Sequence, residues 1–227
     1  SNGQHCYVRK PSESQVWEID LALPNLTHQV TNWIDSEFLD IDQRRIMSVS
    51  VSGRGEDPIE IFREYPDANL VMSDLPDGFS VKRQSDVSSL ASALSGLRLD
   101  DVKLKPFAPR IPALSTSLVL STFDGVIVQM TLTPADGKYY AAFSVSYNEM
   151  IRLSDTSLVS DPKLLLSPDA AKLQAETLNE KLNKWSFVLP EWKAKRLVLR
   201  RSDLIEQYRR GRQILIAFAG AKDADNE

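Results

Sequence analysis

The strand pattern of this chain is clearest in residues 118–147, which read LVLSTFDGVIVQMTLTPADGKYYAAFSVSY. Apolar side chains alternate with polar ones in this stretch, which predicts strands with one buried face. Asp124-Gly125 predicts a two-residue hairpin turn, because glycine tolerates a positive φ. Pro134-Ala135-Asp136-Gly137 predicts a second turn. The stretch therefore predicts a three-stranded antiparallel meander, whose apolar faces include Val126, Val128, Met130, Leu132, Tyr139, Ala141, Phe143, Val145 and Tyr147.

The chain after this meander predicts a helix and then shorter elements. Pro168 and Asp169 favour a helix start, and the apolar residues that follow have helical spacing. We expect strands at 186–189 and 196–199, and a last helix capped by Ser202 or Asp203 that continues through Tyr208. The predicted apolar face of the first of these helices comprises Ala171, Ala175, Leu178, Leu182 and Trp185.

The first half of the chain has the same order of elements. Alternating stretches at 5–10 and 15–21 predict a hairpin, and residues 32–35 predict a short helical turn. Further strands are predicted at 47–51, 59–63 and 69–72, the first two joined by Gly53-Arg54-Gly55. Asp86 is the expected cap of a helix whose apolar face comprises Val87, Leu90, Ala91, Leu94 and Leu97.

These patterns predict an α+β protein with two successive antiparallel β-meander-plus-helix units, arranged as a duplicated module. The first unit covers residues 1–104, and the second covers 117–227 with a basic C-terminal strand and helix. Residues 105–116 include Pro106, Pro109 and Pro112, and this proline-rich stretch favours an extended linker.

The composition of the chain argues against several classes of function. The chain has 227 residues, of which 42% are hydrophobic and 26% charged, as in an ordinary globular protein. The net charge of −4 gives no reason to expect binding to nucleic acid. Cys6 is the one cysteine, so neither an intrachain disulfide nor a thiolate metal cage can form. The longest apolar run, 214–219, is too short to span a bilayer.

The sequence predicts no catalytic, cofactor-binding or metal-binding residues. The only histidines are His5 and His28, and His5 and Cys6 would point to opposite faces of a strand. Two carboxylate pairs could in principle divide acid and base roles, but Asp at element ends usually caps or turns the chain. The pairs are Asp40 with Asp42 and Asp100 with Asp101.

The strongest charge feature is the segment 191–212, which has eight basic and three acidic residues. It could contact a protein partner or a membrane, or it could be an ordinary solvated surface. The candidate contact residues are Lys193, Lys195, Arg196, Arg200, Arg201, Arg209 and Arg210. Aromatic residues could line a ligand groove, although a core position is the default, and these are Tyr139, Trp185, Phe187 and Trp192.

Several short motifs resemble the DUF4340 family. They begin with Tyr7-Val8-Arg9 and Val16-Trp17, and continue through Asn32-Trp33-Ile34-Asp35, Leu39-Asp40-Ile41, the run 94–102 (LSGLRLDDV), Phe123-Asp124-Gly125-Val126 and the run 182–190 (LNKWSFVLP). The resemblance implies an extracytoplasmic domain behind one N-terminal transmembrane helix, often accompanying ABC-2-type transporter or gliding-motility components. It brings no catalytic motif.

We therefore expect a non-catalytic periplasmic or otherwise extracytoplasmic accessory domain that binds a protein of the cell envelope. Ser1-Asn2 resembles the remnant of a cleaved tag, so we expect the anchoring helix to precede Gly3 in the full-length protein. The alternatives are a module that binds a small ligand or envelope polymer between the two units, and a hydrolase that uses the paired carboxylates.

Overall fold

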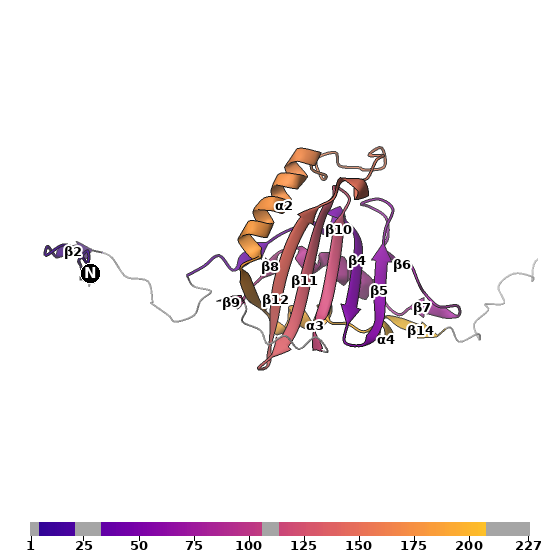
Figure 1. The fold of residues 1–227 in the computed structure, drawn as a ribbon, viewed down its shortest axis with the longest axis horizontal. Helices are drawn as coiled ribbons and strands as arrows, with labels where there is room; N and C mark the ends of the chain where they lie inside the picture. The colour runs from indigo at the N-terminus through magenta and orange to yellow at the C-terminus, as the bar shows by residue number, and fades with distance from the viewer. Residues whose placement is uncertain (1–4, 21–32, 106–113, 208–227) are drawn as a thin grey trace, which may run out of the picture. The chain divides into compact units, whose positions relative to one another are not determined.

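The computed structural model describes residues 5–20, 33–105 and 114–207 (Figure 1). The side chains of His5 and Cys6, the whole of His28, and Arg209, Arg210 and Arg212 lie outside the described parts. The contacts divide the chain into two units, one of residues 1–35 and one of residues 36–227.

The first unit contains a single described hairpin. Strands β1 (His5–Val8) and β2 (Trp17–Asp20) pair antiparallel, with His5 opposite Asp20 and Val8 opposite Trp17. This confirms the hairpin predicted for residues 5–21. Residues 33–35, in contrast, form a turn and a bend in place of the predicted helical turn.

The second unit is built on an eight-stranded sheet with the order β6-β5-β4-β10-β11-β12-β13-β9, and every neighbouring pair is antiparallel. The α+β class is therefore confirmed. The strands are β4 (Ile46–Gly53), β5 (Glu56–Phe62), β6 (Val71–Met72), β9 (Asp101–Leu104), β10 (Thr116–Thr122), β11 (Val126–Ala135), β12 (Lys138–Tyr147) and β13 (Trp185–Leu189).

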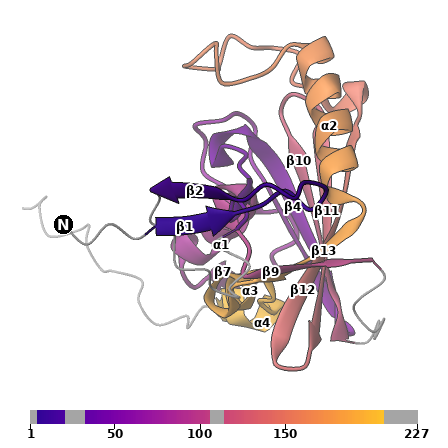
Figure 2. The ribbon, with the colours of Figure 1, turned by 90° about the vertical axis from the view of Figure 1, so that its left-hand side faces the viewer.

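Short strands and helices complete this unit, and Figure 2 shows α1, α3 and α4 gathered on one side of the sheet. Two small ladders join β3 (Glu37–Leu39) to β8 (Leu97–Arg98) and β7 (Phe79–Val81) to β14 (Ile205–Gln207). The helices are η2 (Gln43–Arg45), α1 (Gln84–Ala91), η3 (Ser92–Leu94), η5 (Glu149–Ile151), α2 (Pro168–Leu182), α3 (Glu191–Leu197) and α4 (Arg201–Leu204).

The two faces of the large sheet differ in polarity, as the strand alternation predicts. One face is buried and carries the core, including Val49, Leu118, Leu120, Val128 and Met130. The alternate positions are partly or fully exposed and are rich in serine, with Ser121 directly opposite Ser48. The serines on this face are Ser48, Ser50, Ser52, Ser117, Ser121, Ser144 and Ser146.

Helix α2 begins as predicted and protects an edge of the sheet. Its N-cap is Ser167, whose hydroxyl accepts a hydrogen bond from Ala170 N, and Pro168 occupies the first turn. Strand β13 pairs with residues 139–142 of β12, so the later half of β12 has no outer strand among the described residues. Asn179 of α2 accepts a hydrogen bond from Val145 N at 3.0 Å, so the helix satisfies part of that edge.

The two Asp-Gly turns differ from one another. Asp136-Gly137 is a two-residue turn in which both residues have positive φ, typical of a type I′ hairpin. The connection before β11 instead has three residues, Phe123–Gly125, so the two-residue prediction at Asp124 is wrong. Gly125 is required there: its φ is 94°, and a Cβ would lie 2.7 Å from the carbonyl oxygen of Asn148.

Three further predictions need correction near the helices. Residues 196–199 do not form a strand, because α3 continues through Leu197 and buries Ala194 and Leu197 on one helical face. The last predicted helix ends at Leu204, and the chain then pairs with β7 as β14. Helix α1 begins at Gln84, so Asp86 lies in its first turn and does not cap it.

The structure divides the chain at Asp35 and not at the predicted linker 105–116. Strand β4, before that stretch, pairs along its length with β10, after it, from Gly53 opposite Thr116 to Ile46 opposite Thr122. Strand β9 likewise pairs with β13. Because these ladders join the two halves into one sheet, they share one hydrophobic core. Residues 106–113 of the predicted linker lie outside the described residues.

Candidate functional site

The basic segment singled out in the sequence lies on α3, on the connection after it and on α4. Five of its seven candidate contact residues are described: Lys193, Lys195, Arg196, Arg200 and Arg201. The short helix α3 follows Pro190 and is fixed to the core by Ala194 and Leu197, both buried. The structure therefore places these cations on a surface with a rigid support.

Lys193 is the most enclosed lysine of the segment. Its Nζ donates a hydrogen bond to the carbonyl oxygen of Ser92 at 2.9 Å, which ties α3 to the end of η3. Burial, together with the nearby charge of Arg196, lowers the pKa of Lys193 below its ordinary value. Lys193 therefore contributes to packing as well as to surface charge.

The exposed side of α3 carries a cation over an aromatic ring. The guanidinium of Arg196 lies 5.7 Å from the ring centroid of Trp192, and Trp192 is 62% exposed. Lys195 forms an exposed ion pair with Glu191 at 2.7 Å, and this hydrogen bond raises the pKa of Lys195. An exposed tryptophan beside arginine and lysine is the residue chemistry enriched in protein–protein interfaces.

The two arginines after α3 connect it to the β4–β5 hairpin. Arg200 forms an ion pair with Glu56, with Nε and Oε1 separated by 3.2 Å. Arg201 is mostly enclosed: it donates to the carbonyl oxygen of Pro58 at 2.9 Å and also contacts the Asp74 carboxylate and backbone carbonyl. Arg201 therefore holds α4 against the start of β5, and its guanidinium is less accessible than that of Arg200.

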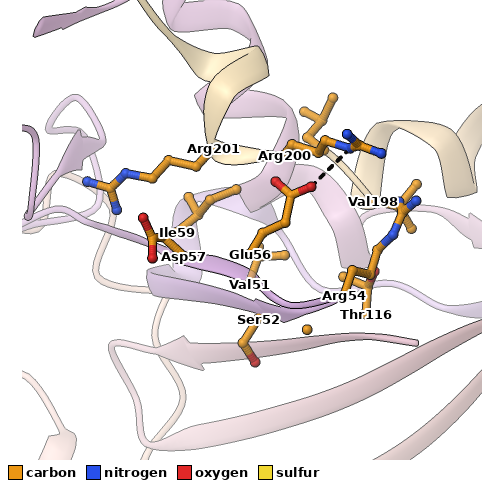
Figure 3. Close-up of a pocket in the computed structure, with 12 residues that line it drawn as sticks. Val51, Ser52, Arg54, Glu56, Asp57, Ile59, Thr116, Val198, Arg200 and Arg201 are labelled. Atoms are coloured by element: carbon orange, nitrogen blue, oxygen red, sulfur yellow. Dashed lines mark ion pairs between the residues drawn. The ribbon is translucent and has the colours of Figure 1, made fainter. Parts of the chain in front are cut away.

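A small hollow lies between this segment and the hairpin (Figure 3). In Figure 3 the Arg200 guanidinium meets Glu56, while Arg201 points away from that pair. Thr116, which is buried, also lines the hollow, and its Oγ1 has no hydrogen-bond partner in the described residues. The cavity volume is only about 20 Å³, which is room for about one water molecule.

Arg54 stands at the edge of this hollow in an unusual backbone conformation. Its φ is 61°, because Arg54-Gly55 forms the two-residue turn between β4 and β5. Arginine is uncommon at a position with positive φ. Arg54 has no ion-pair partner among the described residues, and it places a second exposed arginine near Arg200 at the hollow. The Gly53-Arg54-Gly55 pattern predicts the turn but not this proximity, since residues 54 and 200 are far apart in the chain.

The paired carboxylates occupy capping and edge positions. The Asp42 carboxylate accepts a hydrogen bond from Arg44 N and caps η2, as Asp at an element end is expected to do. Asp40 accepts one from Gly96 N at 2.8 Å. For Asp101, burial alone raises the pKa, but hydrogen bonds from Lys103 and from Val102 N outweigh it, and the pKa is lowered. A carboxylate held ionised in this way does not suit the role of a general acid.

The four candidate groove aromatics are not brought together. Phe187 is buried and stacks on Phe38 with centroids 4.3 Å apart, so it belongs to the core. Trp185 begins β13, whereas Trp192 lies beyond the end of that strand on α3. Tyr139 is opposite Leu189 in the ladder. The four residues are therefore distributed over β12, β13 and α3, and the buried Phe187 belongs to the core and not to a groove.

One buried charged group was not anticipated from the sequence. Asp124 is fully buried, and its carboxylate accepts from Arg45 at 2.9 Å and from Leu166 N at 3.0 Å. Arg45 also donates to Gln174 of α2 at 2.8 Å. The Asp-Gly dipeptide indicated only a turn, and no local signal marks its aspartate as the partner of an arginine 79 residues away.

The described residues contain neither a metal-ligand cluster nor a helix that could cross a membrane. Within them, no group of three or more His, Cys, Asp and Glu side chains is arranged to hold a metal ion. None of the helices in the described ranges is both long and apolar enough to cross a membrane.

The first half of the chain matches a known protein family. No curated protein and no solved structure matches the chain. A family model, described as "Domain of unknown function (DUF4340)", matches residues 1–112. The match covers the β1–β2 hairpin and the second unit as far as β9, whereas the motifs at 123–126 and 182–190 lie beyond it. The first half of the chain is therefore similar to the DUF4340 family, as its motifs predict.

Proposed function

We propose that this chain is a non-catalytic binding domain that recognises another protein of the cell envelope, such as a component of an ABC-type transport system. In this proposal the domain lies in the periplasm or elsewhere outside the cytoplasm, and an N-terminal transmembrane helix of the full-length protein tethers it. The location and the transporter association rest on the family resemblance described above.

The observation that carries the binding proposal is the exposed face of α3. Trp192 offers a large apolar surface to solvent, and Arg196 lies over its ring. Tryptophan and arginine dominate the binding energy of many protein interfaces. The helix that presents them packs on the core through Ala194 and Leu197 and is also held by the Lys193–Ser92 hydrogen bond. A surface that is already rigid loses little conformational entropy on binding.

The charges on this face indicate the chemistry of the partner. Arg196, Arg200 and the nearby Arg54 present positive charge, and only Arg200 of these three has an ion-pair partner among the described residues. A complementary surface would carry carboxylates together with an apolar group that packs on Trp192. We therefore propose an acidic protein surface as the partner.

The arrangement of strands also supports an internal duplication. The meander β4-β5-β6 and the meander β10-β11-β12 are joined through their first strands, β4 and β10, and each is followed along the chain by a helix. Two related units would be expected to join in this symmetric way. We keep the duplication as part of the proposal, with β6-β5-β4 of one copy beside β10-β11-β12 of the other, while β9 of the first half pairs with β13 at the far edge of the sheet.

The alternative of a ligand between the two halves is less well supported. The halves meet through the β4–β10 ladder, and the hollow that spans both has a volume of about 20 Å³. That volume is too small for a sugar unit or a metabolite. A hydrolase using Asp100 and Asp101 is also disfavoured, because the Asp101 carboxylate forms an ion pair with Lys103.

The proposal is tested by affinity capture of the full-length, membrane-anchored protein from its native cells, followed by mass spectrometry. The variant Trp192→Ala/Arg196→Glu should reduce recovery of the envelope partner by about tenfold or more, as expected for loss of central interface residues. The matched control is Leu173→Ala/Lys172→Glu, which makes the same kinds of change on exposed residues of α2. Arg201 is left intact because its loss would disturb the link between α4 and β5.

Two outcomes would overturn the proposal. Equal partner recovery with both double variants would show that α3 is not the contact surface. Recovery of envelope polymer or a small molecule without any protein partner would favour the ligand-binding or enzymatic alternatives.

A further inference from the structure

A second hollow lies beside α1, between η2 and the connection that follows β5. Its volume is about 150 Å³, several times that of the hollow near Arg200. Its lining is mostly polar and includes Arg63, Gln43, Asn69 and Ser88, with Leu70 and Ala91 as apolar neighbours. Within the part of the chain that the structure describes, no carboxylate side chain lines this hollow.

Arg63 is a buried cation without a carboxylate partner in the described residues. Its side chain donates to the carbonyl oxygens of Ile46 at 2.7 Å and of Pro66 at 2.8 Å, and also to that of Gln43. Each of these acceptors is neutral, and Arg63 is only 9% exposed. A guanidinium has five N–H groups, so these three bonds leave two without an acceptor.

The charge of Arg63 therefore stays uncompensated at short range. Burial lowers its pKa, and the more distant Asp67 and Asp42 offset this effect only in part. Both of these carboxylates are engaged elsewhere: Asp67 accepts from Ser160 at 2.7 Å, and Asp42 binds Arg44. A buried charge is costly unless it is paired, so an anion beside Arg63 would be stabilising.

Three other polar side chains of the hollow are free to form hydrogen bonds with a ligand. The side chains of Gln43, Asn69 and Ser88 make no hydrogen bond to another group within the described residues. Two amides and a hydroxyl can each donate to an acceptor oxygen. Together with Arg63 they provide several donors around one space, and hydrogen bonds from an arginine to an anion are among the stronger ones in proteins.

We propose that this hollow binds a small oxyanion, a carboxylate or phosphate group, through Arg63 with support from Gln43, Asn69 and Ser88. The volume corresponds to about five water molecules at roughly 30 Å³ each, which suits a single carboxylate or phosphate group and excludes a nucleotide. The anion could be free in solution or be the exposed end of a larger molecule. The proposal is independent of the α3 surface and does not rest on it.

The hollow near Arg54 does not have the same character. Its arginines are accompanied by Glu56 and Asp57 in the lining, and Arg200 is already paired with Glu56. An anion there would compete with carboxylates of the protein itself. Arg54 therefore serves as the internal control for general attraction of anions to surface arginines.

The test is a titration of the purified 227-residue chain with inorganic phosphate and, separately, with acetate, at ionic strength held constant with chloride. Isothermal calorimetry and thermal unfolding should show saturable binding of at least one of the two. Phosphate alone would indicate a phosphoryl ligand and acetate alone a carboxylate. NMR of the arginine Nε–H groups should report the Arg63 signal shifting during the same titration.

Two variants fill the hollow without removing the hydrogen bonds of Arg63. Ser88→Leu and Asn69→Leu should each raise the apparent Kd at least tenfold, whereas Arg54→Gln should leave it within twofold. Ser88 and Asn69 are exposed positions, so both variants are expected to fold. Absence of saturable binding, or equal binding by wild type and the two filled variants, would overturn the proposal.

Discussion

The arginines at the η2 end of the large sheet and those of the α3–α4 segment are held in different ways. Arg45 and Arg63 are buried, and each is surrounded by protein acceptors: Arg45 by Asp124 and Gln174, Arg63 by three backbone carbonyls. Arg196 and Arg200, in contrast, are exposed and make one cation–aromatic contact and one ion pair. The two regions have the same kind of side chain but different solvent exposure.

This difference indicates which arginines stabilise the fold and which are exposed for contact with a protein partner. An exposed ion pair contributes little, since water and salt screen it. A buried arginine whose partner is removed leaves an uncompensated charge, at a cost of several kcal/mol. Mutations that remove Arg45, Arg63 or their partners should therefore reduce stability, whereas mutations on the exposed side of α3 should alter binding of the protein partner and leave stability nearly unchanged.

The largest expected effect comes from Asp124→Asn. The substitution keeps the size of the side chain but removes the charge that compensates Arg45. It also replaces one carboxylate oxygen, an acceptor, with an amide NH2 group, a donor. We expect the free energy of unfolding to fall by about 3–5 kcal/mol, measured by urea denaturation. The same change at Asp136→Asn, in the exposed type I′ turn, should alter it by less than about 0.5 kcal/mol.

If both variants unfolded at the same urea concentration, the expected difference in stability between the two Asp-Gly turns would be contradicted. That result would mean that the Arg45–Asp124 pair contributes no more than an exposed turn residue. A large decrease in the free energy of unfolding for both variants would instead indicate that both turns require aspartate.

A smaller effect is expected from Arg63→Gln. The shorter amide cannot reach all three carbonyl oxygens, so some of these buried acceptors lose their donors, at a cost of about 2–3 kcal/mol. Arg196→Gln removes only the exposed cation over Trp192 and should cost less than about 1 kcal/mol. The measurement is urea unfolding of the two variants under the same conditions. An equal decrease in the free energy of unfolding for both would contradict the expected difference.

The smallest effect concerns Lys193, which lies between the two kinds of environment. Its folded-state pKa is lowered by burial, so just below the ordinary lysine pKa of about 10.4 the unfolded state binds more protons than the folded state. The stability contribution of Lys193 should therefore rise as the pH approaches that value. At neutral pH, Lys193→Met should change stability only slightly, because the lost hydrogen bond to Ser92 is offset by the removed burial cost of the charge.

The measurement is the difference in unfolding free energy between wild type and Lys193→Met across alkaline pH. We expect the difference to shift in favour of wild type as the pH rises, by a small amount. A constant difference over this range would mean that the Lys193 environment does not favour its neutral form. Lys195→Met serves as the control, because its ion pair with Glu191 raises its pKa and gives the opposite trend.

Much of the local structure could be predicted from the sequence. The alternation in residues 118–147 predicts the strands, Pro168 marks the start of α2, and Arg54-Gly55 and Asp136-Gly137 are turns. Each of these depends on the conformations of a few neighbouring residues. The predicted strand at 196–199 failed because alternation over four residues cannot be distinguished from the end of a helix.

The candidate site could be predicted only in part. The density of lysine and arginine after residue 191 identified the surface of α3, where Arg196 and Trp192 lie exposed. It could not show that Arg201 is enclosed against Asp74, or that Arg54 lies nearby. The partners of a side chain on another element depend on strand order, which local patterns do not specify.

Local sequence patterns specify where the chain turns, which faces of the strands are apolar, and where the surface cations are concentrated. Which charged groups are buried depends instead on the tertiary fold. Asp124 and Asp136 stand in the same dipeptide at neighbouring turns, yet only Asp124 meets an arginine, because the pairing of β4 with β10 brings Arg45 beside it. Local rules act through backbone conformation over a few residues, whereas burial of a charge requires contacts between residues far apart in the chain.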